Sequence, residues 1–175
     1  MQKSFLLTFF LFVITYSFGQ RDTVKLRDIQ KNQQSIVTDR APQAIYFQIG
    51  GSGPILSVNY DRRFAKKVNG AGFAVGLGYF GISGIGIFSI PVSLNYLFGK
   101  NSHFIEAAAG ASFVTATSDL FNDDAQTGST FIYHVNLGCR YQPTRGGFFF
   151  RGGISPLFIS NGYLTSYYIG FGHNF

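Results

Sequence analysis

The strongest constraint on the fold is the alternation of side-chain character over the last ten residues of the sequence. Counting back from the end, every second residue is large and mostly apolar: Phe175, His173, Phe171, Ile169 and Tyr167. The residues between them are mostly small or polar: Asn174, Gly172, Gly170, Tyr168 and Ser166. Successive side chains of a β-strand point to opposite faces, so this segment predicts a strand with two unlike faces.

The same alternation recurs from residue 44 onward and predicts further strands at 45–50, 55–61, 72–80, 87–98, 103–115, 130–142 and 147–159. The apolar faces carry no Asp, Glu, Lys or Arg, whereas the opposite faces carry Asp61, Glu106, Arg140 and Arg151. A Lys or Arg facing lipid near the midplane costs about 2–4 kcal/mol. The pattern therefore predicts an all-β protein: a closed eight-stranded antiparallel up-and-down transmembrane β-barrel with its apolar faces outward. Because Pro91 and Pro156 fall inside two of these strands, we expect a bulge or an early strand end at each.

The composition supports a barrel in lipid. Charged residues make up 13% of the 175 residues, whereas soluble domains average about 25%. A soluble eight-stranded lipid-binding barrel is the alternative, but its outer face would consist mostly of Gly, Ala, Ser and Asn. The formal charge of +6 is compatible with nucleic-acid binding in general; a predicted export signal argues against such a partner. Cys139 is the only cysteine, so no internal disulfide is expected.

The N-terminal residues have the pattern of a secretory signal. Lys3 precedes a short apolar run at 5–14, and small residues follow at 17–19. We expect 1–19 to be a cleaved signal peptide, with a membrane anchor as the alternative. Residues 20–43 are polar and mixed in charge, which predicts a periplasmic N-terminal segment, either flexible or forming a short helix or partial plug. The barrel is predicted to span 44–175.

Aromatic residues near the ends of alternate strands predict which end of the barrel is periplasmic. They form a predicted periplasmic girdle of Tyr60, Tyr96, Tyr141 and Phe175, because amphipathic aromatics favour the membrane–water interface. A general preference of aromatics for strands is the alternative explanation, but the repeated position at the end of alternate strands favours the girdle. The turns on the same side are basic, with Arg62, Arg63, Lys66, Lys67, Lys100 and Arg145. The longest gap between predicted strands carries Asp119, Asp123 and Asp124 and predicts an acidic extracellular loop without the spacing of a calcium site; both termini are then periplasmic.

The inward faces predict a polar cluster inside the barrel, formed by Glu106, Arg140, Arg151, Asn95, Asn136 and His134. If the hairpin is symmetric about Asp123, Glu106 lies opposite Arg140. Arginine binds carboxylate through a planar fork, so a structural ion-pair core is expected. A relay or a small-anion site is the functional alternative. No cofactor and no metal site are predicted.

Ser112 and His134 suggest a second chemistry, because the same symmetry places them opposite each other. A hydrolase of membrane lipids would also need a group that orients the histidine, and Glu106 lies three inward positions from Ser112. We therefore predict no catalytic residues.

Residues 44–175 resemble the outer-membrane β-barrel family of Gram-negative bacteria, in particular the small OmpA/OmpX-like barrels. The barrel pattern, the terminal Phe175, the signal-like start and the stretch LGCRYQPTRGGFFFR at 137–151 carry this resemblance. It implies contact with outer-membrane lipids, insertion by the barrel assembly machinery and a monomer. The predicted role is structural or surface-interactive, with loop partners unknown; a lipid-modifying enzyme and a small-solute channel are the alternatives.

Overall fold

The computed structural model describes residues 40–53, 55–118, 126–160 and 162–175. Within these residues the chain forms eight strands: β1 (Gln43–Gly50), β2 (Leu56–Arg63), β3 (Gly70–Ile82), β4 (Ile85–Lys100), β5 (His103–Thr117), β6 (Thr127–Tyr141), β7 (Gly147–Ile159) and β8 (Gly162–Asn174). The predicted signal peptide, most of the predicted periplasmic segment and the acidic residues Asp119, Asp123 and Asp124 lie outside the described residues. No helix in the described part of the chain is long and apolar enough to cross a membrane.

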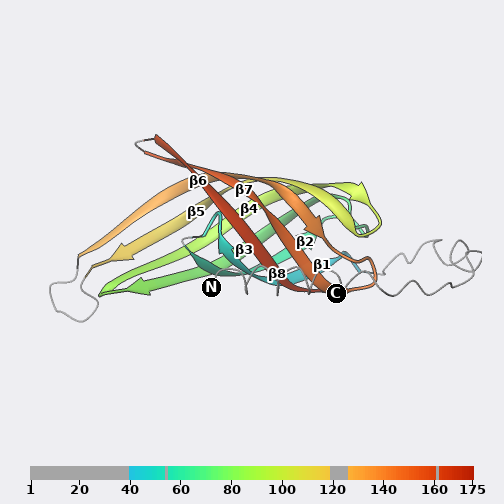
Figure 1. Cartoon of the computed structure of the whole chain (residues 1–175), viewed down its shortest axis with the longest axis horizontal. Helices are drawn as coiled ribbons and strands as arrows, with labels where there is room; N and C mark the ends of the chain where they lie inside the picture. The colour runs from blue at the N-terminus through green and yellow to red at the C-terminus, as the bar shows by residue number, and fades with distance from the viewer. Residues whose placement is uncertain (1–39, 54, 119–125, 161) are drawn as a thin grey trace, which may run out of the picture. The chain divides into compact units, whose positions relative to one another are not determined.

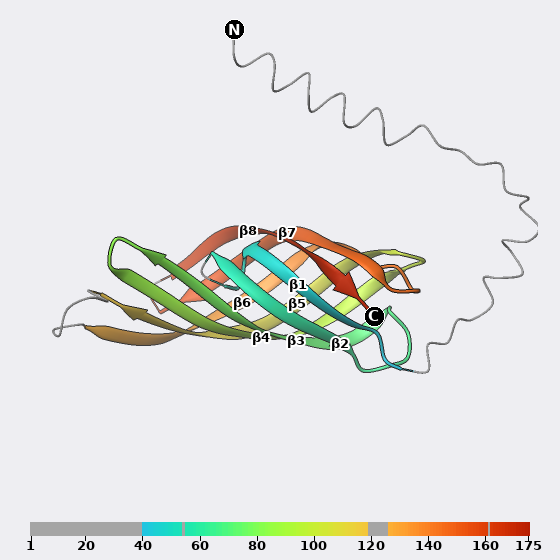
Figure 2. The ribbon, with the colours of Figure 1, turned by 90° about the horizontal axis from the view of Figure 1, so that it is seen from below.

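The strands form one closed barrel in sequence order (Figures 1 and 2). Each strand pairs antiparallel with the next, and β8 pairs antiparallel with β1. The backbone N–H groups of Gln43 and Phe175 each donate to the other residue's carbonyl, at 3.0 and 2.9 Å. The predicted all-β closed barrel of eight antiparallel strands is confirmed, and the strand bounds agree to within a few residues.

The barrel has two different ends. The end where Gln43 and Phe175 pair also contains the turns at 64–69, 101–102 and 142–146, and we call it the terminal end. At the opposite end, β2–β3 pairing stops at Gly78 and β6–β7 pairing stops at Tyr133. The β3–β4 and β5–β6 hairpins continue beyond these points, and we call this four-strand projection the extension (Figure 1).

Alternation of side chains gives the barrel an apolar outside and a polar inside. Outward residues such as Leu94 and Ile105 are 65% and 63% exposed. Inward residues are largely buried, and many of them are polar: Gln48, Ser57, Asn59, Asp61, Arg63, Ser89, Asn95, Glu106, Ser112, His134, Asn136, Arg140, Arg151 and Ser155. In water this arrangement would expose an extended apolar surface; lipid is the solvent that it suits.

The expectation of a bulge or an early strand end at the two prolines is wrong. Both β4 and β7 run through their prolines. Pairing is interrupted beside Pro91 toward β3 and beside Pro156 toward β6, and it resumes in the same register. On the other side Pro91 pairs with Ser112 and Pro156 with Thr165. Proline lacks an N–H but its φ is compatible with a strand. Each proline-containing strand therefore loses backbone pairs with one neighbouring strand and stays continuously paired with the other.

Candidate functional site

A cluster of buried charges occupies the interior toward the terminal end. We call it the ion-pair cluster, and its charged members are Asp61, Arg63, Glu106, Arg140 and Arg151, each 2% exposed or less. They come from β2, β5, β6 and β7. Their places in the alternation direct them inward, since the residues on either side of each point outward.

Arg140 is the centre of the ion-pair cluster. Its Nε donates to Glu106 Oε2 at 3.0 Å and its Nη2 to Glu106 Oε1 at 2.7 Å, so the guanidinium binds this carboxylate through two hydrogen bonds. Nη2 also donates to Asp61 Oδ2 at 3.0 Å, and Nη1 to Gln142 Oε1 at 3.3 Å. One arginine therefore links the carboxylates of β2 and β5.

Asp61 has a second arginine partner, Arg63, two residues further along β2. Arg63 Nη2 donates to both carboxylate oxygens of Asp61, at 2.8 and 2.9 Å, and to Asn95 Oδ1. Asn95 Nδ2 donates to Asp61 Oδ2 at 2.6 Å. The prediction that Arg63 lies in a basic turn is wrong: β2 continues through it, and its parity with Asp61 directs it inward.

Arg151 is held by one carboxylate and two aromatic rings. Its Nη2 lies 3.2 Å from Glu106 Oε1, and its Nη1 donates to the Tyr46 hydroxyl at 2.6 Å. The guanidinium carbon lies 5.1 Å from the Tyr46 ring centroid and 4.8 Å from that of Tyr168. Three arginines thus meet two carboxylates, and the electron-rich ring faces supply further attraction for the third cation.

The register of the β5–β6 hairpin differs from the predicted one. Glu106 pairs with Gly138, and Phe104 pairs with Arg140, so the centre of symmetry is not at Asp123. The shift is an even number of residues, and every side chain keeps its face. Glu106 and Arg140 therefore still meet, as diagonal neighbours, and Arg140 pairs directly with Arg151 on β7.

The remaining predicted interior residues lie apart from the ion-pair cluster. Asn136 Oδ1 accepts a hydrogen bond from Ser155 Oγ at 2.6 Å. Ser112 Oγ lies 3.4 Å from His134 Nδ1, but it also lies 2.6 Å from the Ser52 carbonyl, to which it donates. Its hydrogen is therefore directed at the backbone and not at the imidazole. In the part of the chain that the structure describes, His134 has no carboxylate hydrogen-bond partner.

The connection between β1 and β2 folds into the mouth of the barrel opposite the terminal end. Gly51 is buried and its N–H donates to Ser166 Oγ at 3.2 Å. Together with the contact between Ser52 and Ser112, this attaches the connection to β5 and β8. No pattern in the sequence predicts this closure.

The predicted girdle residues lie near the terminal end. Tyr96 and Phe175 are 46% and 56% exposed, and Tyr60 donates from its hydroxyl to Gln43 Oε1 at 2.7 Å. Tyr141 packs its ring against His103, with centroids 5.2 Å apart. Among the described residues no group of three or more His, Cys, Asp or Glu side chains is arranged to hold a metal ion.

Comparisons with known proteins identify the fold. No family model matches the sequence, and no curated protein sequence does. Solved structures do match: the N-terminal β-barrel domain of Pseudomonas aeruginosa OprF has a TM-score of 0.58 at 14% identity, over 77% of this chain and 96% of that one. The chain has the fold of the small outer-membrane β-barrels.

Two further structures agree with this assignment. Ail, the attachment invasion locus protein of Yersinia pestis, has a TM-score of 0.52 at 14% identity, covering 78% of this chain and 99% of that one. Neisserial surface protein A has a TM-score of 0.50 at 18% identity, covering 77% and 94%. The predicted resemblance to small outer-membrane barrels is confirmed at the level of the fold, and at these identities the likeness concerns the fold alone.

Proposed function

We propose that this chain is a monomeric integral protein of the outer membrane of a Gram-negative bacterium, with a filled core and a structural or surface-interaction role. The observation that carries the proposal is the pairing of an exposed apolar outer face with a buried ion-pair cluster. Large apolar side chains cover the outside from β1 to β8. Charged side chains that face inward are matched by partners within the barrel.

We assign the terminal end to the periplasm. Its exposed side chains include Arg62, Lys67, Lys100 and Arg145, and the aromatic residues Tyr60, Tyr96, Tyr141 and Phe175 lie at the same end. In outer-membrane barrels the short turns are periplasmic and the longer loops extracellular. The extension then projects from the cell, and insertion would depend on the barrel assembly machinery.

The core argues against the two alternative functions. An eight-stranded barrel has an interior just wide enough for side chains to fill, and here large side chains such as Arg140, Phe149 and His134 lie fully buried within it. A channel for small solutes is not favoured by such a core. A lipid-modifying hydrolase is not favoured either, because Ser112 and His134 lack an orienting carboxylate and are buried.

The extension is the part of the protein that suits contact with a surface. Beyond Gly78 on β3 and Tyr133 on β6, the described residues of these strands have a free edge. Hydroxyl side chains pair across the β5–β6 hairpin, with Thr115 and Ser129 3.1 Å apart and Thr117 and Thr127 3.2 Å apart. Unpaired strand edges and hydroxyl groups both offer hydrogen bonds to a partner.

Labelling of intact cells tests the location and the orientation together. In a Cys139→Ser background, Gly128→Cys places a thiol on the extension and Arg145→Cys places one at the terminal end; both positions are exposed or open. A membrane-impermeant maleimide is expected to label the first variant on intact cells and the second only after the outer membrane is permeabilised. The opposite pattern would reverse the orientation, and a soluble protein that shows no heat-dependent gel mobility would overturn the location.

A shortened hairpin separates the structural role from the surface role. Residues 119–125 are replaced by Asn-Gly, a two-residue turn that suits flanking residues joined by a backbone hydrogen bond, as Ser118 N–H and the Gln126 carbonyl are at 2.9 Å. The shortened barrel is expected to insert with unchanged heat-dependent mobility, because the paired strands are retained. If it restores detergent resistance to cells that lack the protein, the role is structural; if it inserts but loses attachment of cells to a surface, the role is surface-interactive.

A further inference from the structure

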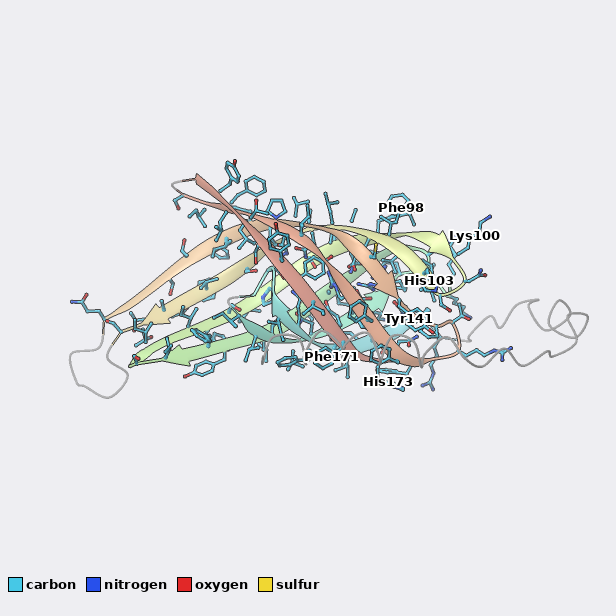
Figure 3. All side chains as sticks on the ribbon, viewed as in Figure 1. Phe98, Lys100, His103, Tyr141, Phe171 and His173 are labelled. Atoms are coloured by element: carbon cyan, nitrogen blue, oxygen red, sulfur yellow. The ribbon has the colours of Figure 1, made fainter. Side chains whose placement is uncertain are left out.

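An apolar groove lies on the outer face of the barrel at the terminal end. Its volume is about 690 Å³, and it runs across β4, β5, β6 and β7. Large side chains form its walls and one small side chain forms its floor: Phe98, Ile105, Tyr141, Phe148 and Phe150, with Cys139 between them. Phe98, His103 and Tyr141 are seen together at this end in Figure 3.

The groove exists because bulky outward residues surround a small one. Cys139 is exposed, and it is paired on one side with Ile105 and on the other with Gly152. Phe148 and Phe150 on β7 are 59% and 38% exposed. On a lipid-facing surface, a depression with such walls fits a flexible hydrocarbon chain, which can follow the gaps between the rings.

Basic side chains lie at the rim of the groove. Lys100 and His103 are directly paired at the turn between β4 and β5, and both are exposed. The His103 ring packs on Tyr141, which lines the groove. A second exposed histidine, His173, is paired with Phe148 on the far side. Basic side chains at both margins thus border an apolar floor, with the positive charge of Lys100 on one side.

The described outer surface has no acidic side chain beside these basic residues. Asp61 and Glu106 are the only acidic residues among those described, and both are 0% exposed inside the barrel. A lysine and hydrogen-bond donors next to an apolar groove give the two features of a site for an anionic lipid: an acyl surface and a headgroup site.

We propose that this groove binds an anionic glycerophospholipid, with one acyl chain lying over Cys139 and the phosphate at Lys100 and His103. The lipid would belong to the periplasmic leaflet, so the assignment of the leaflet rests on the proposed location and orientation. The binding itself depends only on the groove and its rim, and it is testable on the purified chain. It adds a specific ligand to a protein whose proposed role requires only a general lipid environment.

Native mass spectrometry of the folded full chain, released from detergent micelles, tests the headgroup site. Phosphatidylglycerol is compared with phosphatidylcholine, which has the same phosphate but no net charge. Each surface cation contributes about 1 kcal/mol to the attraction of anionic lipid, which corresponds to about fivefold in affinity. Lys100→Gln with His103→Gln is expected to weaken phosphatidylglycerol binding by about fivefold or more and to leave phosphatidylcholine binding unchanged.

The matched control removes cations from the same end of the barrel but away from the groove. Arg62 and Lys67 are exposed and lie at the end of β2 and in the turn after it. Arg62→Gln with Lys67→Gln is expected to change phosphatidylglycerol binding by less than about twofold, since these residues do not border the groove. Equal losses in the two double variants would mean that the lipid responds to total charge, and the site would be rejected.

The single cysteine reports on the acyl site without any change to the groove. An apolar maleimide is expected to react with Cys139 more slowly when phosphatidylglycerol is added to the micelles. In the control, Cys139→Ser with Ala109→Cys places the thiol at an exposed outward position on β5 that does not line the groove. Equal slowing at both positions, or equal slowing by both lipids, would show general shielding by lipid and overturn the proposal. Failure of the intact-cell labelling would overturn only the leaflet and the location.

Discussion

Replacing Arg140 with Met is expected to lower the free energy of unfolding by about 3–5 kcal/mol, the range measured when one partner of a buried ion pair is removed. Arg140 is 1% exposed and donates to both Glu106 and Asp61. Without it, Glu106 keeps only Arg151 and Asp61 keeps Arg63, so both buried carboxylates lose a short charged contact. Unfolding by urea in lipid vesicles, followed by circular dichroism and gel mobility, measures the change.

Arg145→Met is the control for this prediction, because Arg145 is exposed in the turn between β6 and β7. Its replacement is expected to change the unfolding free energy by less than about 0.5 kcal/mol. Arg140→Met leaves the carboxylates of Glu106 and Asp61 without one of their arginine partners. Adding Glu106→Gln removes one of these two negative charges, so the double variant should be more stable than the sum of the two single changes predicts. Equal effects of Arg140→Met and Arg145→Met would show that the ion-pair cluster does not contribute to stability.

Replacing Leu94 with Arg is expected to destabilise the inserted barrel by about 2–4 kcal/mol. Leu94 is 65% exposed on the outer face of β4, well inside the paired part of that strand. A guanidinium at this depth has hydrocarbon around it, and its desolvation accounts for the loss. The same urea unfolding in vesicles measures the effect.

Depth provides the control for Leu94→Arg. Ile45 is also outward and 49% exposed, but it lies near the start of β1 at the terminal end. Ile45→Arg is expected to cost about 0–1 kcal/mol, since a charge near the interface can reach water. In a soluble barrel with the same alternation both residues would be on the surface and both changes would be mild, so similar small effects would refute the membrane assignment.

The sequence predicted the faces of the strands but could not predict their register. Period-two alternation fixes which side a residue takes, and the inward assignments of Asn95, Glu106 and Arg140 depend on nothing else. A shift of two residues leaves every side chain on the same face. The predicted β5–β6 pairing was therefore wrong by two residues, although the predicted contact between Glu106 and Arg140 is present. Their long side chains meet across the strands as diagonal neighbours.

Two members of the interior, Arg63 and Tyr46, were missed although their parity was visible. Arg63 was assigned to a turn because it precedes other basic residues, yet it stands two positions from Asp61. Tyr46 falls between the outward residues Ile45 and Phe47. Tyr168 was placed on the inward face with Gly170 and Gly172, but its contact with Arg151 was not predicted. The two tyrosines lie inside because their rings flank the Arg151 cation, a pairing that depends on strands far apart in the sequence.

The seam between β1 and β8 has a consequence for how the protein is made. The strands that close the barrel are the first and the last of the described strands, and the backbones of Gln43 and Phe175 are hydrogen-bonded across the seam. Contacts of such large sequence separation form late, because a long loop must be closed before they contribute any stability. Until β8 pairs with β1, β1 has an unpaired edge. The barrel is then open on that side, and the ion-pair cluster is not fully enclosed. Closure of the seam between β1 and β8 is therefore expected to be among the last steps of folding, and it removes the open edge of the sheet.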